Sequence, residues 1–244
     1  YFSIGNASGS NGSFTLVSGK NLSVGGHEHI GALGTGAFTQ SGGTNTVAGN
    51  LWLGDFDGGN GTYNLSGTGS LSVGGHEYIG YAGTGAFTQS GGTHTVTNIL
   101  YLGLESGGSG TYNLSGTGNL SAAYEYIGNT STGVFTQSGG THTVTNSLYL
   151  GLESGGSGTY NLSGTGSLSA GYEYIGHFGT GVFTQTGGTH TVTSTLYLGY
   201  YSGGNGSYNL TGGTHTVTND LNLGYYSGGN GTYNLSGTGS LSAD

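Results

Sequence analysis

The 244-residue sequence contains no cysteine, proline or methionine, and Lys20 is its only strongly basic residue. Without cysteine there can be no disulfide framework and no thiolate metal site. With a formal net charge of −9, the chain has no basic face for nucleic acid, so we expect no nucleic-acid partner. No apolar run reaches about 18 residues, so we predict neither a membrane-spanning helix nor membrane insertion.

Glycine is the most prominent residue that is present, with 59 copies, and 19 tyrosines accompany it. Chains with little apolar content often stay disordered, but here the apolar residues recur at fixed intervals, which favours a fold. The strongest landmark is a short apolar motif ending in glycine. It occurs ten times, at steps of 23 to 26 residues: FSIG 2–5, EHIG 28–31, LWLG 51–54, EYIG 77–80, LYLG 100–103, EYIG 125–128, LYLG 148–151, EYIG 173–176, LYLG 196–199 and LNLG 221–224.

One aromatic residue per unit forms a second landmark with the same spacing: Phe14, Phe38, Tyr63, Phe87, Tyr112, Phe135, Tyr160, Phe183, Tyr208 and Tyr233. The basic unit is therefore about 24 residues. The stretch LYLGLESGGSGTYNLSGTG begins at Leu100 and is repeated without change from Leu148. This 48-residue echo shows that two unlike units alternate, one with LYLG and GTYNLSG, the other with EYIG, FTQSGG and THTVTN.

Each unit contains three short strand candidates separated by Gly, Ser and Asn clusters, and no segment has helical periodicity. A single unit cannot bury its apolar face, whereas a stack of units can. We therefore predict an all-β fold: a right-handed parallel β-helix, or β-solenoid, of about ten rungs, one unit per rung. Residues 1–244 are expected to form a single block without caps, one unit of a longer fibre.

Alternation within the strands predicts which side chains face inward. In TYNL, Tyr112 and Leu114 are expected inside, so the ten aromatics would form one interior ladder. In LYLG the middle residue is expected outside, which predicts an outer aromatic stripe. Three interpretations of this stripe stay open. It could pack rods side by side, it could stack against sugar rings, or tyrosine could be there only because it suits a strand surface. It comprises His29, Trp52, Tyr78, Tyr101, Tyr126, Tyr149, Tyr174 and Tyr197.

Recurrent glutamates are the best candidates for catalysis: Glu28, Glu77, Glu125 and Glu173, and separately Glu105 and Glu153. Members of each set lie two or more rungs apart, and two rungs span about 9–10 Å. That spacing is close to the roughly 6.5–9.5 Å between the carboxylates of inverting glycosidases. The repeat itself places these groups, however, and no unit breaks the pattern to make a unique site. We therefore predict no catalytic residues and no enzyme.

Metal and cofactor sites are also predicted to be absent. Of the recurrent His94, His142, His190 and His215, only the last two occupy adjacent rungs, about 4.8 Å apart. Adventitious metal binding there, or at the cluster of His27, Glu28 and His29, stays open. GGSGTYNL is similar to a calcium-binding nonapeptide but has tyrosine at the aspartate position. Only Asp55 and Asp57 in DFDGGNG keep a plausible carboxylate pair.

Two further surface roles stay open. The threonines of THTVT are similar to the flat faces of ice-binding β-solenoids, although the motif occurs mainly on alternate rungs. Sequons recur in phase at Asn64, Asn113, Asn161, Asn209 and Asn234. They would be glycan acceptors if these residues face outward, or simply polar residues favoured near turns.

The two ends of the chain match one another. Joining the C-terminal LSAD to the N-terminal YFSIG gives LSADYFSIG, in register with LSAAYEYIG at 120–128. Uncapped strand edges invite pairing with another chain. We therefore expect the stack to continue, in a longer tandem chain or by head-to-tail association. The predicted junction residues are Tyr1, Phe2, Ile4, Leu241 and Asp244.

The motifs LYLGYYSGGNGSYNL and FTQTGGTHTVT resemble repeats of large secreted bacterial β-solenoid proteins, such as autotransporter passenger domains and filamentous adhesins. The resemblance covers the whole chain and implies an extracellular or cell-surface location. We expect an extracellular structural fibre that partners with itself. The alternative is an adhesin stalk that contacts glycans, such as a polysaccharide, or other cells through its outer aromatics.

Overall fold

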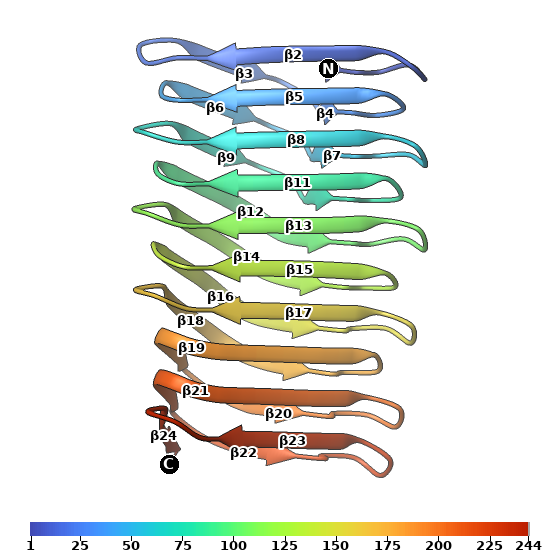
Figure 1. Ribbon diagram of the computed structural model, residues 1–244. Coiled ribbons are helices and arrows are strands. Elements are labelled where there is room, and N and C mark those ends of the chain that lie inside the picture. Colours follow the sequence, from blue (N-terminus) through green and yellow to red (C-terminus); the bar gives the residue numbers. More distant parts are fainter. Residues whose placement is uncertain (244) are drawn as a thin grey trace.

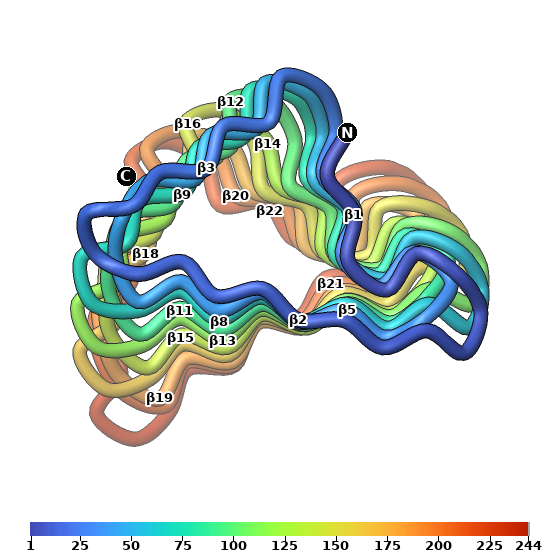
Figure 2. Tube along the Cα trace, turned by 90° about the horizontal axis from the view of Figure 1, so that it is seen from above, coloured from blue at the N-terminus to red at the C-terminus, as the bar shows by residue number. Residues whose placement is uncertain are grey.

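A computed structural model describes residues 1–243 as a rod of ten stacked rungs, each rung being one circuit of the chain (Figure 1). All regular elements of these residues are strands, and every strand of the inner rungs pairs in parallel with its copies in the rungs above and below. No helix that could span a membrane occurs among them. Viewed from the N-terminal end, the chain runs clockwise as it recedes (Figure 2). The prediction of a right-handed parallel β-helix is therefore confirmed.

Each rung has three faces, named A, B and C in chain order from β2. Face A consists of β2 (Asn11–Leu16), β5 (Thr35–Gln40), β8 (Asn60–Leu65), β11 (Thr84–Gln89), β13 (Ser109–Leu114), β15 (Thr132–Gln137), β17 (Ser157–Leu162), β23 (Asn230–Leu235) and the first parts of β19 (Thr180–Val192) and β21 (Asn205–Val217). The last parts of β19 and β21 lie on face B, so these two strands bend around a corner.

Face B also contains β3 (Asn21–Val24), β6 (Thr44–Val47), β9 (Ser70–Val73), β24 (Ser240–Ala243) and the first parts of β12 (Thr93–Leu102), β14 (Asn119–Ile127), β16 (Thr141–Leu150) and β18 (Ser167–Ile175). The last parts of those four long strands lie on face C. The remaining strands of face C are β1 (Phe2–Ile4), β4 (Glu28–Ile30), β7 (Leu51–Leu53), β10 (Glu77–Ile79), β20 (Leu196–Leu198) and β22 (Leu221–Leu223).

The core follows from alternation within each strand. In β13 the buried residues are Gly110, Tyr112 and Leu114, and the residues between them face outward. Parallel register places each inward residue against its copies, so that Tyr112 pairs with Phe87 on one side and Phe135 on the other. The result is one continuous hydrophobic core along the whole rod.

The glycine that ends each face C motif is required by the corner that follows. Gly80 has a φ of 72°, in the left-handed region that side chains other than glycine rarely adopt. A Cβ atom on this residue would lie 2.1 Å from the carbonyl oxygen of Ser109 in the next rung. The chain therefore turns into face A at a point where neighbouring rungs approach too closely for any side chain.

The two unit types become two kinds of rung. Apolar rungs carry leucine at three inward positions, as at Leu100, Leu114 and Leu120 in the fifth rung. The second, fourth, sixth and eighth rungs are polar rungs. At the same three positions they bury a glutamate, a glutamine and a histidine, with asparagine replacing histidine in the second rung. Polar and apolar rungs thus alternate through most of the rod.

Candidate functional site

The interior aromatic ladder runs through the rod. Nine rings, from Phe38 to Tyr233, stack face to face with centroids 4.5–4.9 Å apart and interplanar angles of 3–5°. Phe14, in the first rung, is partly buried and tilted by 44° against Phe38. Such stacking contributes roughly 0.5–1.5 kcal/mol per pair beyond the area buried.

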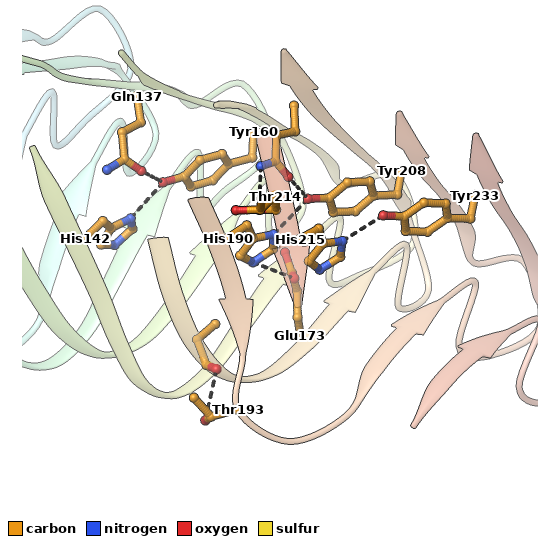
Figure 3. A network of polar contacts seen from close by, with 12 residues as sticks. Gln137, His142, Tyr160, Glu173, His190, Thr193, Tyr208, Thr214, His215 and Tyr233 are labelled. Carbon is orange, nitrogen blue, oxygen red and sulfur yellow. Dashed lines mark hydrogen bonds and ion pairs between the residues drawn. The ribbon is translucent and has the colours of Figure 1, made fainter. Parts of the chain in front are cut away.

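Beside this ladder lies a set of buried polar chains, each formed by a polar rung and the tyrosine of the following rung. In the sixth and seventh rungs, Tyr160 Oη lies 2.6 Å from Gln137 Oε1 and 3.0 Å from His142 Nδ1 (Figure 3). His142 Nε2 lies 2.9 Å from Glu125 Oε2. The equivalent chains are Gln89–Tyr112–His94–Glu77, Gln185–Tyr208–His190–Glu173 and, with asparagine for histidine, Gln40–Tyr63–Asn45–Glu28.

The direction of each hydrogen bond in the Gln137 chain follows from its neighbours. Gln137 Nε2 donates to the carbonyl oxygens of Gly140 and Ser167, which leaves Oε1 as an acceptor. Tyr160 uses its single hydroxyl hydrogen for that acceptor. His142 Nδ1 must therefore carry a hydrogen and donate to Tyr160 Oη, so a neutral imidazole has no hydrogen on Nε2.

Burial shifts the pKa values of two carboxyl groups in these chains, those of Glu173 and Glu28. Burial raises the pKa of the Glu173 carboxyl well above its usual range, and burial lowers the pKa of His190 to about 3. In the second rung, burial raises the pKa of Glu28 to about 7, although the hydrogen bond from Asn45 opposes the shift. In the eighth rung, a protonated Glu173 carboxyl group can therefore face a neutral His190 imidazole.

The carboxyl–imidazole contact is close but poorly directed. Glu173 Oε2 lies 3.2 Å from His190 Nε2, yet it lies away from the direction that a hydrogen bond to this nitrogen requires. Neither carboxyl oxygen of Glu173 has another partner. A buried polar group without a well-formed hydrogen bond costs about 1–3 kcal/mol, so this end of the chain is held in place by packing.

The ninth rung has both apolar and polar residues at the inward positions, and its polar residue is a neighbour of the Glu173–His190 pair. It has Leu196 and Leu210 at two of the inward positions but His215 at the third. The rings of His190 and His215 stack at 4.5 Å with an interplanar angle of 2°. Burial also lowers the pKa of His215, to about 2.

Glu173, His190 and His215 are the three described residues whose ligand atoms gather closely enough to suggest a metal, all within 4.8 Å. A zinc ion would need to lie 2.0–2.1 Å from each nitrogen and in the plane of each ring. Two parallel imidazoles 4.5 Å apart have no such common point, so they would have to rotate out of the stack. The prediction of no metal site stays a prediction.

A carboxyl group, an imidazole and a hydroxyl group that follow one another in space are the groups found in proton relays. Here Glu125 and Tyr160 are 0% exposed and His142 is 1% exposed. A substrate could reach these atoms only if neighbouring rungs separated. Glu105 and Glu153 are exposed instead, on the loops between faces C and A. The chains fit a role in specifying the rung stack.

Sequence reasoning missed these chains although the signal was present. Aligning EYIG with LYLG places Glu125 at the inward position of Leu100. The same alignment places Gln137 at the position of Leu114 and His142 at that of Leu120, and the structure has this register. Three leucines replaced together on alternate rungs indicate a buried polar network, which a reading of each motif alone does not reveal.

The predicted outer aromatic stripe lies along face C and is half-buried. Trp52 stacks between His29 and Tyr78, at 4.5 and 5.3 Å, and Tyr149 stacks on Tyr174 at 4.6 Å. Tyr126 interrupts the stack, at 76° and 83° to its neighbours. Ring faces are thus mostly covered by other rings, and the edges face outward. The role of the stripe in lateral or glycan contacts stays a prediction.

A second aromatic group, not predicted from the sequence, lies on the loops between faces C and A near the C-terminal end. Its stacked pairs are His177 with Tyr200, Phe178 with Tyr201, Tyr200 with Tyr225 and Tyr201 with Tyr226, at 4.5–5.3 Å. The repeated dipeptide YY in GYYSGG was the available signal. These pairs form two short ladders, His177–Tyr200–Tyr225 and Phe178–Tyr201–Tyr226, each over three rungs.

The remaining candidates separate into inward and outward residues. Glu28 is buried between His27 and His29, which are half-exposed, so these three residues do not converge on one site. The suggested pair of Asp55 and Asp57 also divides, because Asp55 is 5% exposed and contacts His29, whereas Asp57 is exposed. Asp55 therefore faces the rod and Asp57 faces solvent, and a shared role for the two carboxyl groups stays a prediction.

The sequon asparagines lie on the outer side of face A, and the threonines of THTVT face outward while its histidine faces inward. Glycosylation and ice binding therefore stay open. Of the predicted junction residues, Tyr1 is 90% exposed, Phe2 and Leu241 are partly buried and Ile4 is 6% exposed. Asp244 lies outside the described residues.

No family model, no curated protein and no solved structure matches this chain. The β-solenoid and its tandem repeat are established by the structure. The bacterial autotransporter or adhesin origin implied by the resemblance stays a prediction.

Proposed function

We propose that this chain is an extracellular structural protein, a segment of a β-solenoid fibre whose stack of rungs continues beyond its own first and last rungs. The continuation can be further rungs of the same chain or a second copy placed head to tail. The observation that carries the proposal is the composition of the two end rungs among the described residues.

Both end rungs present only apolar side chains at the inward positions. The first rung has Phe2, Ile4, Phe14, Leu16, Leu22 and Val24, and the last has Leu221, Leu223, Tyr233, Leu235, Leu241 and Ala243. Leu223 and Leu235 are 50% and 52% exposed, whereas Leu198 and Leu210, one rung earlier, are 0% exposed. The last rung therefore leaves uncovered the surface that every inner rung buries.

Placing a first rung on a last rung continues the register of the rod. Tyr233 would meet Phe14, Leu235 would meet Leu16, and Leu241 would meet Leu22, in the alignment that already joins neighbouring rungs. The joint contains no glutamate, glutamine or histidine at an inward position. It therefore needs no buried polar partner and is driven by apolar burial.

The test is electron microscopy of the 244-residue chain at neutral pH, comparing Leu235→Glu with Ser242→Glu. Unbranched filaments with a spacing near 4.8 Å are expected for the unchanged chain. Leu235→Glu should abolish them because the joint would bury a charge. The matched control Ser242→Glu adds the same charge at an exposed position of the last rung and should leave them intact.

Discrete rods of one chain length at all concentrations would contradict head-to-tail association. Filaments of Leu235→Glu that equal those of Ser242→Glu would show that the end rungs do not form the joint.

A further inference from the structure

The third rung departs from its repeat at one place on the outer surface. LWLGDFDGGNG at 51–61 occupies the position that LYLGLESGGSG occupies at 100–110. The differences bring the only tryptophan of the chain, Trp52, next to Asp55 and Phe56. In the fifth and seventh rungs, which are of the same type, the corresponding loop residues are Leu104 and Glu105, and Leu152 and Glu153, so the repeat alone does not require this group.

These residues line a pocket of about 360 Å³. Its walls are His29, Trp52 and Tyr78 from the outer aromatic stripe, and Asp55, Phe56 and Tyr81 from the adjoining loops. The volume lies within the range of roughly 300–1,000 Å³ typical of small-molecule sites. The pocket is open to solvent, unlike the polar chains of the core.

The pocket contains a nearly buried hydrogen-bond acceptor. Asp55 is 5% exposed, and its Oδ2 lies 2.8 Å from His29 Nδ1. Its Oδ1 is not among the fully buried atoms that lack a hydrogen-bond partner, so this oxygen stays within reach of solvent in the pocket. A carboxyl oxygen that solvent can reach beside aromatic walls is suited to accept a hydrogen bond from a ligand hydroxyl group, which would replace water.

The aromatic walls select against charged ligands. Trp52 is covered on both faces, by His29 at 3° and Tyr78 at 17°, so its edge is the part left uncovered. Aromatic edges carry the positive side of the ring quadrupole, which disfavours an organic cation. The carboxyl group of Asp55 in the pocket wall disfavours an anion. A neutral ligand rich in hydroxyl groups satisfies both conditions.

We propose that this pocket binds a neutral saccharide. A sugar hydroxyl donates to Asp55 Oδ1, and the apolar C–H face of the sugar packs on Phe56, which is 51% exposed. This site goes beyond the proposed fibre function and is independent of it, because all six lining residues belong to one chain.

Trp52 allows a direct test, because it is the only tryptophan and lies in the pocket wall. The chain would be titrated with neutral tetra- to hexasaccharides of glucose, galactose, mannose and N-acetylglucosamine, up to about 10 mM, a range that covers millimolar affinity. Tryptophan fluorescence and calorimetry would be followed together. Saturable binding with one site per chain is expected for at least one of these saccharides.

The decisive variant replaces Asp55→Leu, Phe56→Glu and Asp57→Ser, which writes the sequence of residues 104–106 into the equivalent loop. Because this sequence already folds at that position of the repeat, the rod should stay intact. Affinity should fall at least tenfold, while the exposed control Glu105→Gln should bind like the unchanged chain. No saturable binding, equal affinity in the variant, or binding of choline in preference to every saccharide would overturn the proposal.

Discussion

At the scale of single residues, the unusual feature is a carboxylic acid in the core of a protein with few charges. Glu28 is 0% exposed, and its position on face C is occupied by Leu51 in the next rung. A carboxyl group at such a position is tolerated in its protonated form, with Asn45 Nδ2 donating to Oε2. Folding therefore depends on pH through this group.

Stability should fall as the pH rises from 4.5 to 7. In this window the unfolded chain loses the Glu28 proton at its ordinary pKa of 4.5, whereas the folded chain retains it until about 7. That difference corresponds to about 3 kcal/mol. Glu28→Gln cannot ionise, so its denaturation midpoint relative to the unchanged chain should rise between pH 4.5 and pH 8.

Chemical denaturation of both chains at pH 4.5 and pH 8 checks this expectation. Glu105→Gln is the control, because Glu105 is exposed and its removal should not change the pH dependence. A pH dependence in Glu28→Gln as steep as in the unchanged chain would mean that Glu28 is ionised in the core.

At the scale of elements, the strands are interchangeable but the corners between them are not. Strands on one face accept Phe or Tyr, and Leu or Gln, at equivalent positions. The corner glycines after face C have no alternative, because neighbouring backbones occupy the space of a side chain. The rod is therefore most sensitive to substitutions at these corners.

Gly80→Ala should destabilise the rod strongly. The added Cβ would meet Ser109 O at 2.1 Å, and alanine disfavours a φ of 72°. A loss of more than about 2 kcal/mol is expected, seen as a lower thermal midpoint by circular dichroism. Gly25→Ala is the matched control, because nothing lies within 4 Å of its Cβ and its φ is ordinary. Equal midpoints for the two variants would contradict this account of the corners.

Much of the element level could be predicted from sequence. The glycine-ended motif and the alternation in TYNL were sufficient for the rung length, the three strands and the inward position of Tyr112. The partners of Tyr112 were not predicted, because its hydroxyl contacts Gln89 on the paired strand β11 and also His94 on β12, which lies on another face of the previous rung. Such contacts depend on the relative position of two faces, which periodicity alone does not specify.

The pocket around Trp52 was missed for a related reason. His29, Trp52 and Tyr78 were expected on one stripe, and this follows from the repeat. Asp55 and Tyr81 lie on loops, and the alternation that predicts side-chain direction in strands does not apply to loops. Their position next to the stripe is therefore seen only in the structure. The sequence feature that could have indicated the pocket is a departure from the repeat, DFD at 55–57 in place of LES at 104–106.

At the scale of the whole molecule, the rungs are organised in pairs. The second, fourth and sixth rungs each lie between two apolar rungs, so that Glu77 is covered by Leu51 on one side and Leu100 on the other. Tyr112 of the next rung completes the polar chain. The unit that can be added or removed without exposing a buried polar group is therefore two rungs.

Deleting residues 100–147 removes one pair and should leave a folded rod of eight rungs. Deleting residues 100–124 removes a single rung and would place Glu125 directly against Glu77, about 4.8 Å away in the core. His94 would also lose its tyrosine partner. The single-rung variant should unfold at a far lower temperature than the pair variant, although fewer residues have been removed from it. Similar thermal midpoints for the two, measured by circular dichroism, would contradict the pairing of rungs.

The alternation also gives the rod two different periods along its axis. The backbone repeats with every strand spacing, about 4.8 Å, whereas the side-chain contents repeat only after two, about 9.6 Å. In fibre diffraction, the polar rungs form a superlattice with twice the repeat of the backbone. A weaker meridional reflection at about 9.6 Å should therefore accompany the main reflection at about 4.8 Å. The mixed ninth rung, with His215 beside Leu196 and Leu210, is a stacking fault in that lattice. The strand spacing continues through this rung, but the two-rung alternation of side chains ends there, because the tenth rung has Leu221, Leu235 and Leu241 where a polar rung would follow.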